Sequence, residues 1–144
     1  MTYNEFIARP IAHKRRILHK IEDVRLKEAA CTTSTTPLKE RVQSSVNNAA
    51  EINIIRYAEA KKDLERLFEG LEAVQNEVRI FLYANLTPIE ADTMEWKYID
   101  DKNIRQIADI TNSSYDCIKS RIKRADKKAR RAYEFMQASE IDPL

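Results

Sequence analysis

Residues 87–131 read TPIEADTMEWKYIDDKNIRQIADITNSSYDCIKSRIKRADKKARR, and this stretch carries the clearest folding signals of the chain. Thr87, Pro88 and Glu90 combine an N-cap residue, a proline at the first helical position and the glutamate of a capping box. These signals predict a helix over 88–98. The side chains that this helix is expected to bury are Ile89, Met94 (or Thr93) and part of Trp96.

A second, shorter helix is predicted directly downstream. Asn103 and Gln106 repeat the capping pattern and mark where it begins. Its apolar side is formed by Ile104, Ile107 and Ala108. Residues 111–113 make the next turn, in which Asn112 is the residue best suited to a left-handed backbone.

The third helix of this stretch is capped by Ser114 or Ser113 and runs to about Tyr133. Its inward-facing residues are expected to be Ile118, Ile122, Ala125 and Ala129. Residues 114–131 hold eight basic and two acidic side chains, whereas the remaining residues hold 17 basic and 21 acidic ones. The net charge of +2 therefore hides a strongly cationic helix, although a charge run of this kind is also compatible with a merely solvated face.

Two helices joined by a short turn, the second of them basic, are typical of a helix-turn-helix that binds double-stranded DNA. The start of the second helix meets base edges in the major groove, and its later turns lie along phosphates. The residues expected to read bases are Tyr115, Asp116, Lys119, Ser120 and Lys123. Those expected to bind phosphates are Asn103, Arg105, Ser114, Arg121, Arg124, Lys127, Lys128, Arg130 and Arg131.

These residues also carry a family resemblance. The segments LTPIE (86–90), WKYI (96–99), IRQIA (104–108) and IKSRIKRA (118–125) resemble the C-terminal promoter-reading domain of bacterial sigma factors. At the turn, residues 111–113 depart from that family's pattern, and Ile110 is expected to supply the apolar contact there. The sequence RVQSS (41–45) ahead of a long helix is similar to phage transcriptional activators of the RinA and ArpU type. This resemblance implies a regulator of late phage genes acting at a promoter, in the cytoplasm of a bacterial host cell.

The N-terminal part is predicted to be a helical hairpin. One helix over 11–30 follows an interruption at Pro10, and residues 32–37 form a connection rich in hydroxyl side chains. A second, long helix over 38–86 carries a heptad seam. The seam residues expected to mediate oligomerisation are Tyr57, Leu64, Leu67, Leu71, Val74, Val78 and Phe81. Because the predicted first helix is too short to cover them, a homodimer is predicted, with an intramolecular bundle as the alternative.

The composition excludes several classes of protein. A single glycine, Gly70, cannot build the glycine-rich loops of nucleotide-binding enzymes, and few turn residues argue against a β-sandwich or barrel. Cys31 and Cys117 form no metal-binding cluster, and His13 and His19 are expected at the surface. No apolar run approaches the length of a membrane span. We therefore expect an all-α, non-enzymatic protein without metal or cofactor.

The expected organisation is a hairpin and oligomerisation region over 1–86, a helix-turn-helix domain over 87–135 and a flexible tail over 136–144. The leading functional hypothesis is a sequence-specific transcriptional regulator; the alternatives are a small terminase-like DNA-packaging protein and a module that docks an acidic protein. An acidic edge is a candidate contact for RNA polymerase, although a solvated face is the simpler interpretation. Its residues are Glu90, Asp92, Glu95, Asp100 and Asp101.

Overall fold

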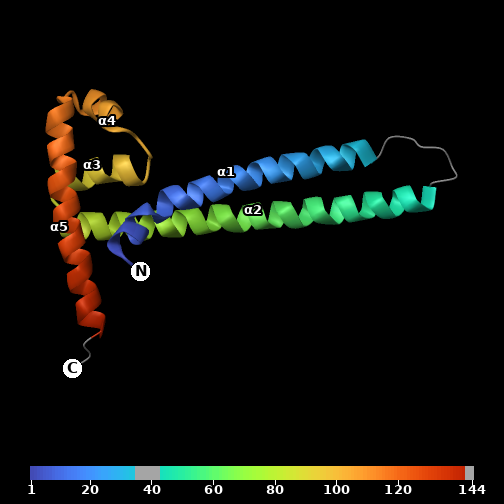
Figure 1. Cartoon of the computed structure of the whole chain (residues 1–144), viewed down its shortest axis with the longest axis horizontal. Coiled ribbons are helices and arrows are strands. Elements are labelled where there is room, and N and C mark those ends of the chain that lie inside the picture. The colour runs from blue at the N-terminus through green and yellow to red at the C-terminus, as the bar shows by residue number, and fades with distance from the viewer. Residues whose placement is uncertain (35–42, 142–144) are drawn as a thin grey trace. The chain divides into compact units, whose positions relative to one another are not determined.

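The chain is all-α, as predicted. The computed structural model describes residues 1–34 and 43–141, which form five helices and no strand (Figure 1). These helices are α1 (Tyr3–Ser34), α2 (Gln43–Asn85), α3 (Pro88–Tyr98), α4 (Ile104–Thr111) and α5 (Tyr115–Ile141). They divide into two compact units: a first unit of residues 1–12 and 72–144, and a second unit, the hairpin, of residues 13–71.

In the hairpin, α1 and α2 run antiparallel. Lys20 of α1 lies 3.3 Å from the carboxylate of Asp63 in α2, and the ring of His13 lies 2.6 Å from the carbonyl oxygen of Leu67. The contact residues rise in number along α1, from 13 to 20, while they fall along α2, from 67 to 63, so the two helices run in opposite directions. Lys20 and Lys27 both form ion pairs with Asp23, and Lys20 also pairs with Asp63, so these four residues form a small network. The hydrogen bonds from Lys27 and Lys20 hold the pKa of the Asp23 carboxyl below its usual value.

Gly70 makes room for His13. A Cβ at position 70 would lie 3.1 Å from Cε1 of the His13 ring, which the contact with Leu67 holds in place. His13 is accordingly half-buried and was wrongly expected at the surface, whereas His19 is exposed. The glycine therefore has a packing role within a helix where alanine would be favoured by about 1 kcal/mol.

This packing predicts a coupling between the two positions. Gly70→Ala should raise the free energy of unfolding by about 1 kcal/mol in a His13→Ala background, where the helix propensity acts alone. In the parent chain, crowding between the new Cβ and the His13 ring should cancel most of that gain in stability. Urea denaturation of the four proteins in a double-mutant cycle measures the difference. Equal effects of Gly70→Ala in both backgrounds would contradict the role assigned to the glycine.

Two of the seven residues of the predicted dimer seam are buried within the chain. Val78 and Phe81 are buried in the core of the first unit, at 0% and 7% exposure, so they are not available to a second chain. The other five seam residues are half-buried. For Val78 and Phe81 the expectation was wrong because α1 begins at Tyr3 and continues through Pro10, which is buried inside the helix, so that α1 offers more surface to α2. The homodimer itself stays a prediction.

The first unit contains the three predicted C-terminal helices. Thr87 and Glu90 form the capping box of α3, and Asn103 and Gln106 form that of α4. Ser114, rather than Ser113, caps α5, since its hydroxyl accepts a hydrogen bond from the backbone N–H of Cys117 at 3.2 Å. These local predictions are confirmed.

Two turns in this unit use a left-handed backbone without glycine. Asn112 has φ 52°, as predicted, and Asp101 in the turn between α3 and α4 has φ 55°. Short polar side chains tolerate this conformation better than other non-glycine residues do. The turn of residues 112–114 sets the start of α5 against α4.

The core of the first unit draws on every helix. The four predicted inward residues of α5 are buried, and Met94 and Thr93 are both fully buried. Met94 and the four α5 residues pack in one apolar cluster with Phe6 of α1 and Leu82 of α2. The compact unit is therefore larger than the predicted domain over 87–135, because the beginning of α1 and the end of α2 cover part of α5.

Three expectations for this unit are corrected. Ile89 is 63% exposed and Ile110 is 48% exposed, so neither supplies a core contact. Residues 136–141, expected in a flexible tail, continue α5 as far as Ile141. Residues 142–144 lie outside the described part of the chain, as does the proposed connection beyond residue 34.

A polar contact inside this unit joins three helices at Asp126 of α5. The hydroxyls of Tyr3 in α1 and Tyr98 in α3 both donate to its carboxylate, at 2.9–3.0 Å. Burial, together with the charge of Asp126, raises the pKa of both tyrosines well above the usual value, so they remain donors. The guanidinium of Arg130 lies 5.5 Å from the centre of the Tyr3 ring.

Candidate nucleic-acid interface

The outer face of α5 is a continuous cationic surface. Because the buried residues recur at three- and four-residue spacing, the residues between them point away from the core. This arc begins with a polar first turn and continues with basic side chains. Its exposed members are Asp116, Lys119, Ser120, Lys123, Arg124, Lys127, Arg130 and Arg131.

All five predicted base-reading residues are exposed. Four of them, Asp116, Lys119, Ser120 and Lys123, lie on the outer arc of the first two and a half turns of α5. Tyr115 is 49% exposed and turns toward the side of α4. The thiol of Cys117 is also exposed at this end of the helix.

Five of the predicted phosphate-binding residues have a role within the chain. The side chains of Asn103 and Ser114 cap α4 and α5. Arg121 is half-buried and donates to the Thr93 hydroxyl at 3.5 Å, and Arg130 donates to the amide oxygen of Asn4 at 3.1 Å. The fifth, Lys128, forms an ion pair with α3.

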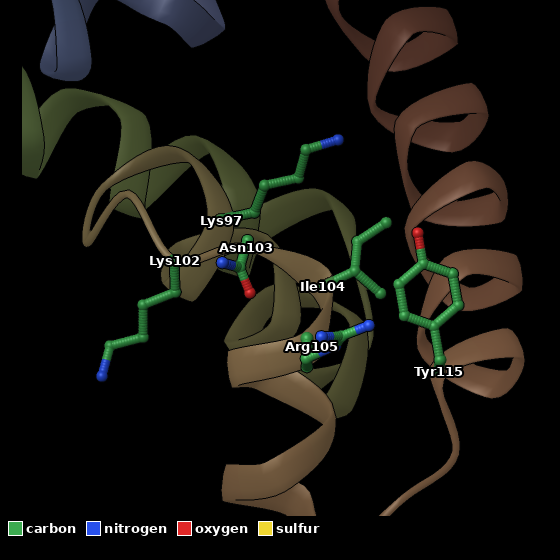
Figure 2. A pocket seen from close by; sticks show the side chains of 6 residues that line it. All are labelled: Lys97, Lys102, Asn103, Ile104, Arg105 and Tyr115. Carbon is green, nitrogen blue, oxygen red and sulfur yellow. The ribbon is translucent and has the colours of Figure 1, made fainter.

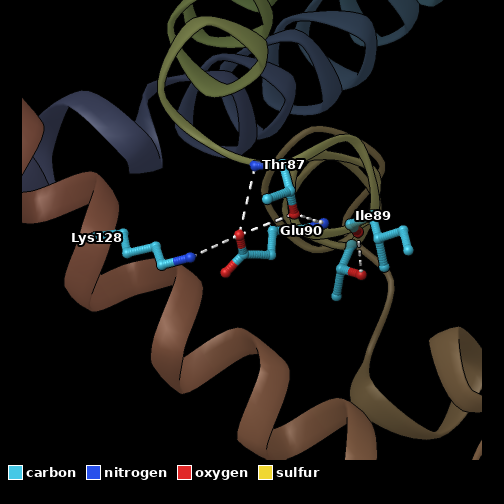
Figure 3. Close-up of polar contacts among 5 residues, drawn as sticks. Thr87, Ile89, Glu90 and Lys128 are labelled. Atoms are coloured by element: carbon cyan, nitrogen blue, oxygen red, sulfur yellow. Dashed lines mark hydrogen bonds and ion pairs between the residues drawn. The ribbon is translucent and has the colours of Figure 1, made fainter.

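Figure 3 shows this ion pair between Lys128 and Glu90, whose atoms Nζ and Oε1 are 3.0 Å apart. The Glu90 carboxylate also accepts from the hydroxyl of Thr87 at 2.9 Å. Burial opposes ionisation of Glu90, but the hydrogen bonds from Lys128 and Thr87 outweigh it and lower its pKa. Lys128 thus positions α5 against α3, while Arg105, Arg124, Lys127 and Arg131 remain exposed to solvent.

Most of the predicted acidic edge is likewise engaged within the chain. Glu95 accepts hydrogen bonds from Arg79 at 2.8 Å and from the Tyr83 hydroxyl at 2.7 Å, and Tyr83 also donates to Asp92. Burial and these two carboxylates raise the pKa of Tyr83. Only Asp100 and Asp101 of the edge are exposed and have no contact of this kind in the described residues. The edge therefore mainly fixes α3 to the end of α2.

A basic hollow of about 420 Å³ lies beside the start of α4 (Figure 2). It is lined by Lys97, Lys102, Asn103, Ile104, Arg105 and Tyr115. The predicted residues Asn103, Arg105 and Tyr115 are thus brought together with two lysines that the sequence analysis missed. Lys97 lies at the end of α3, 4.8 Å from the centre of the Tyr98 ring, and Lys102 precedes the cap of α4.

The predicted phosphate-binding residues all lie in α4 and α5 or cap these helices, whereas Lys97 lies in α3 and Lys102 in the turn that follows it. The signal that identifies them is their position: both flank the turn that leads into α4, close in sequence to the predicted phosphate ligand Asn103. A helix N-terminus favours anions, and three cations around it strengthen that preference. The charge of the hollow therefore suits a negatively charged group such as a phosphate.

Other chemistries find no support in the residues described. Among them, no three histidine, cysteine or carboxylate side chains are grouped so as to hold a metal ion. As far as the chain is described, its helices also lack the combination of length and apolarity that a membrane crossing requires.

Comparison with known proteins adds no relative to this picture: no family model, curated protein or solved structure matches the chain.

Proposed function

We propose that this chain is a sequence-specific regulator of transcription that binds double-stranded DNA, with α5 as the helix that enters the major groove. The observation that supports this most is the order of side chains along the outer arc of α5. Mixed polar groups occupy its first turn, and exposed cations occupy the turns that follow. A recognition helix needs this order, because its start reads bases and its continuation meets the backbone.

The basic hollow supports the same proposal from a second element. Lys102 and Arg105 lie at the start of α4, which precedes the recognition helix in a helix-turn-helix. Cations in this place would bind a phosphate on the strand that flanks the groove. A solvated charged face, the simplest alternative for α5 alone, does not account for cations gathered on a neighbouring helix as well.

Selection from a pool of random duplexes tests the proposal directly. A sequence-specific protein should enrich one motif over successive rounds at 100–150 mM salt, and its affinity should fall steeply as salt rises. Retention of every duplex without enrichment would support a packaging or architectural role instead. Failure to retain any duplex at low salt would refute DNA binding altogether.

The hollow gives a separate prediction. Lys102→Gln should weaken DNA binding by about 3- to 10-fold for all sequences alike and should lower the salt slope by about one. Fluorescence anisotropy with the selected duplex and a scrambled one measures both quantities. Lys62→Gln, an exposed lysine of the hairpin, is the matched control. A change in sequence preference without a change in slope would remove Lys102 from the phosphate contacts.

The functional class beyond DNA binding rests on the resemblance to phage activators and promoter-reading domains. Activation would place RNA polymerase beside the bound protein, and Asp100 and Asp101 are the carboxylates of the acidic edge that remain exposed for such a contact. The second candidate, a small terminase-like packaging protein, shares the helix-turn-helix but assembles as a ring. Transcription from a promoter that carries the selected motif distinguishes the two.

A further inference from the structure

The hairpin has a very small core of its own. Among its described side chains, only Ile17 and Ala60 are buried, at 5% and 1% exposure. The first unit, by contrast, buries a cluster contributed by all five helices. Two packed helices have one shared face, and their remaining faces need another partner to be buried.

Both helices of the hairpin carry a second apolar stripe beside the packed one. On α2, the apolar members of this stripe are Ile54, Tyr57, Leu64 and Phe68, and the exposed Lys61 lies between them. Together the five positions recur at alternating spacings of three and four. On α1, Leu18 and Ile21 follow the same rule. Four of these side chains are strongly exposed: Leu18 66%, Ile21 42%, Ile54 54% and Phe68 50%. This spacing is the one by which helices pack against further helices.

The two stripes lie on the same side of the hairpin. Successive helical residues are about 100° apart, so Leu18 and Lys61 are each turned by that angle from the inward residues Ile17 and Ala60. Between antiparallel helices, equal rotations lead to the same side of the pair. The ion pair of Lys20 with Asp63 illustrates this rule, since these residues lie three positions after Ile17 and Ala60, respectively. That pair marks the opposite, charged side.

The exposed area is close to what a stable dimer requires. At roughly 200 Å² for a large side chain, the exposed fractions of Leu18, Ile21, Ile54 and Phe68 leave about 400 Å² of apolar surface. An interface of about 800 Å² per partner, somewhat more than half apolar, contains about 450 Å². An apolar surface of this size is comparable to the largest patch on a typical monomer, and such patches are often functional.

We propose that this side of the hairpin binds a second copy of the same chain, so that two hairpins form a four-helix arrangement around a two-fold axis. A copy is the occupant that fits, because each hairpin supplies the same pair of stripes with helix-packing spacing and a two-fold interface is self-complementary. This interface shares Tyr57 and Leu64 with the seam expected from the sequence, whereas Val78 and Phe81 of that seam are buried within the chain. A dimer formed in this way would carry two copies of the proposed DNA-binding unit.

The mass of the full chain in solution tests the proposal without DNA. Light scattering at 10–50 µM should give twice the chain mass of 16.8 kDa. Leu18→Glu with Phe68→Glu places four charges in the interface and should raise the dissociation constant about 100-fold or more, giving the single-chain mass. Circular dichroism should be unchanged, because both side chains are exposed in the isolated chain.

The matched control is Leu26→Glu with Ile55→Glu. These residues are exposed to a similar extent, 60% and 57%, but lie away from the stripes. The control should keep the mass of the dimer. A parent chain of single mass at 50 µM, a ring of many copies, or a Leu18→Glu/Phe68→Glu variant that dimerises like the parent would each overturn the proposal. None of these results depends on whether the chain binds DNA.

Discussion

Lys119→Glu with Lys123→Glu is expected to reduce specific DNA binding by about 100-fold or more at 100 mM salt. Both side chains are exposed on the outer arc in the first turns of α5. A base contact contributes about 1–3 kcal/mol, and reversing the charge adds repulsion from the phosphates on either side of the groove. Electrophoretic mobility shift with the selected duplex measures the loss. The fold should be unaffected, since both side chains are exposed.

Arg16→Glu with Lys62→Glu is the control for net charge. It changes the charge of the chain by the same amount, at exposed positions of the hairpin. If long-range attraction alone drives binding, both double variants should weaken it equally. If α5 is the recognition helix, only the variant at 119 and 123 should lose the preference for the selected duplex over a scrambled one. Equal binding by that variant and the parent would exclude α5 from the interface.

Asp126→Ala should lower the free energy of unfolding by about 2–4 kcal/mol. Its carboxylate is the shared acceptor for the hydroxyls of Tyr3 and Tyr98, which come from helices far apart in the sequence. Removing it leaves two hydroxyl groups without an acceptor, and each bond to a charged group contributes about 1.5–3 kcal/mol. Urea denaturation followed by circular dichroism measures the change in midpoint at constant slope.

Two further variants identify the cause of this loss. Asp126→Asn retains one acceptor oxygen and should recover part of the stability. Asp109→Ala removes an exposed carboxylate of α4 and should change the free energy of unfolding by less than about 0.5 kcal/mol. If Asp126→Ala is as stable as the parent, the three helices are held by their apolar contacts alone.

The parts of the fold that depend on near neighbours were predictable. Capping at Thr87 and Asn103 requires a partner three residues away, and the left-handed turn at Asn112 requires only a tolerant side chain. The inward stripe of α5 follows from helical spacing. The all-α class, the order of the helices and the exposure of the base-reading residues all derive from signals of this short range.

What depends on distant contacts was not predictable in the same way. The continuation of α1 through Pro10 requires packing that outweighs about 3 kcal/mol of helix disruption, and no local pattern reports that balance. The pairing of Lys128 with Glu90 needs the placement of α3 on α5. Helical spacing alone nevertheless predicts that Arg121 and Lys128, which are seven residues apart, flank the buried stripe and do not lie on the outer arc.

The exposed thiol of Cys117 allows the candidate interface to be labelled chemically. It stands in the first turn of α5, between the predicted base-reading residues and the buried stripe, while the other cysteine, Cys31, belongs to the last turn of α1 in the hairpin. With Cys31 replaced by serine, a maleimide fluorophore would mark this turn alone. Emission from that dye would then follow docking onto a duplex in real time, with no alteration to the cations that bind it.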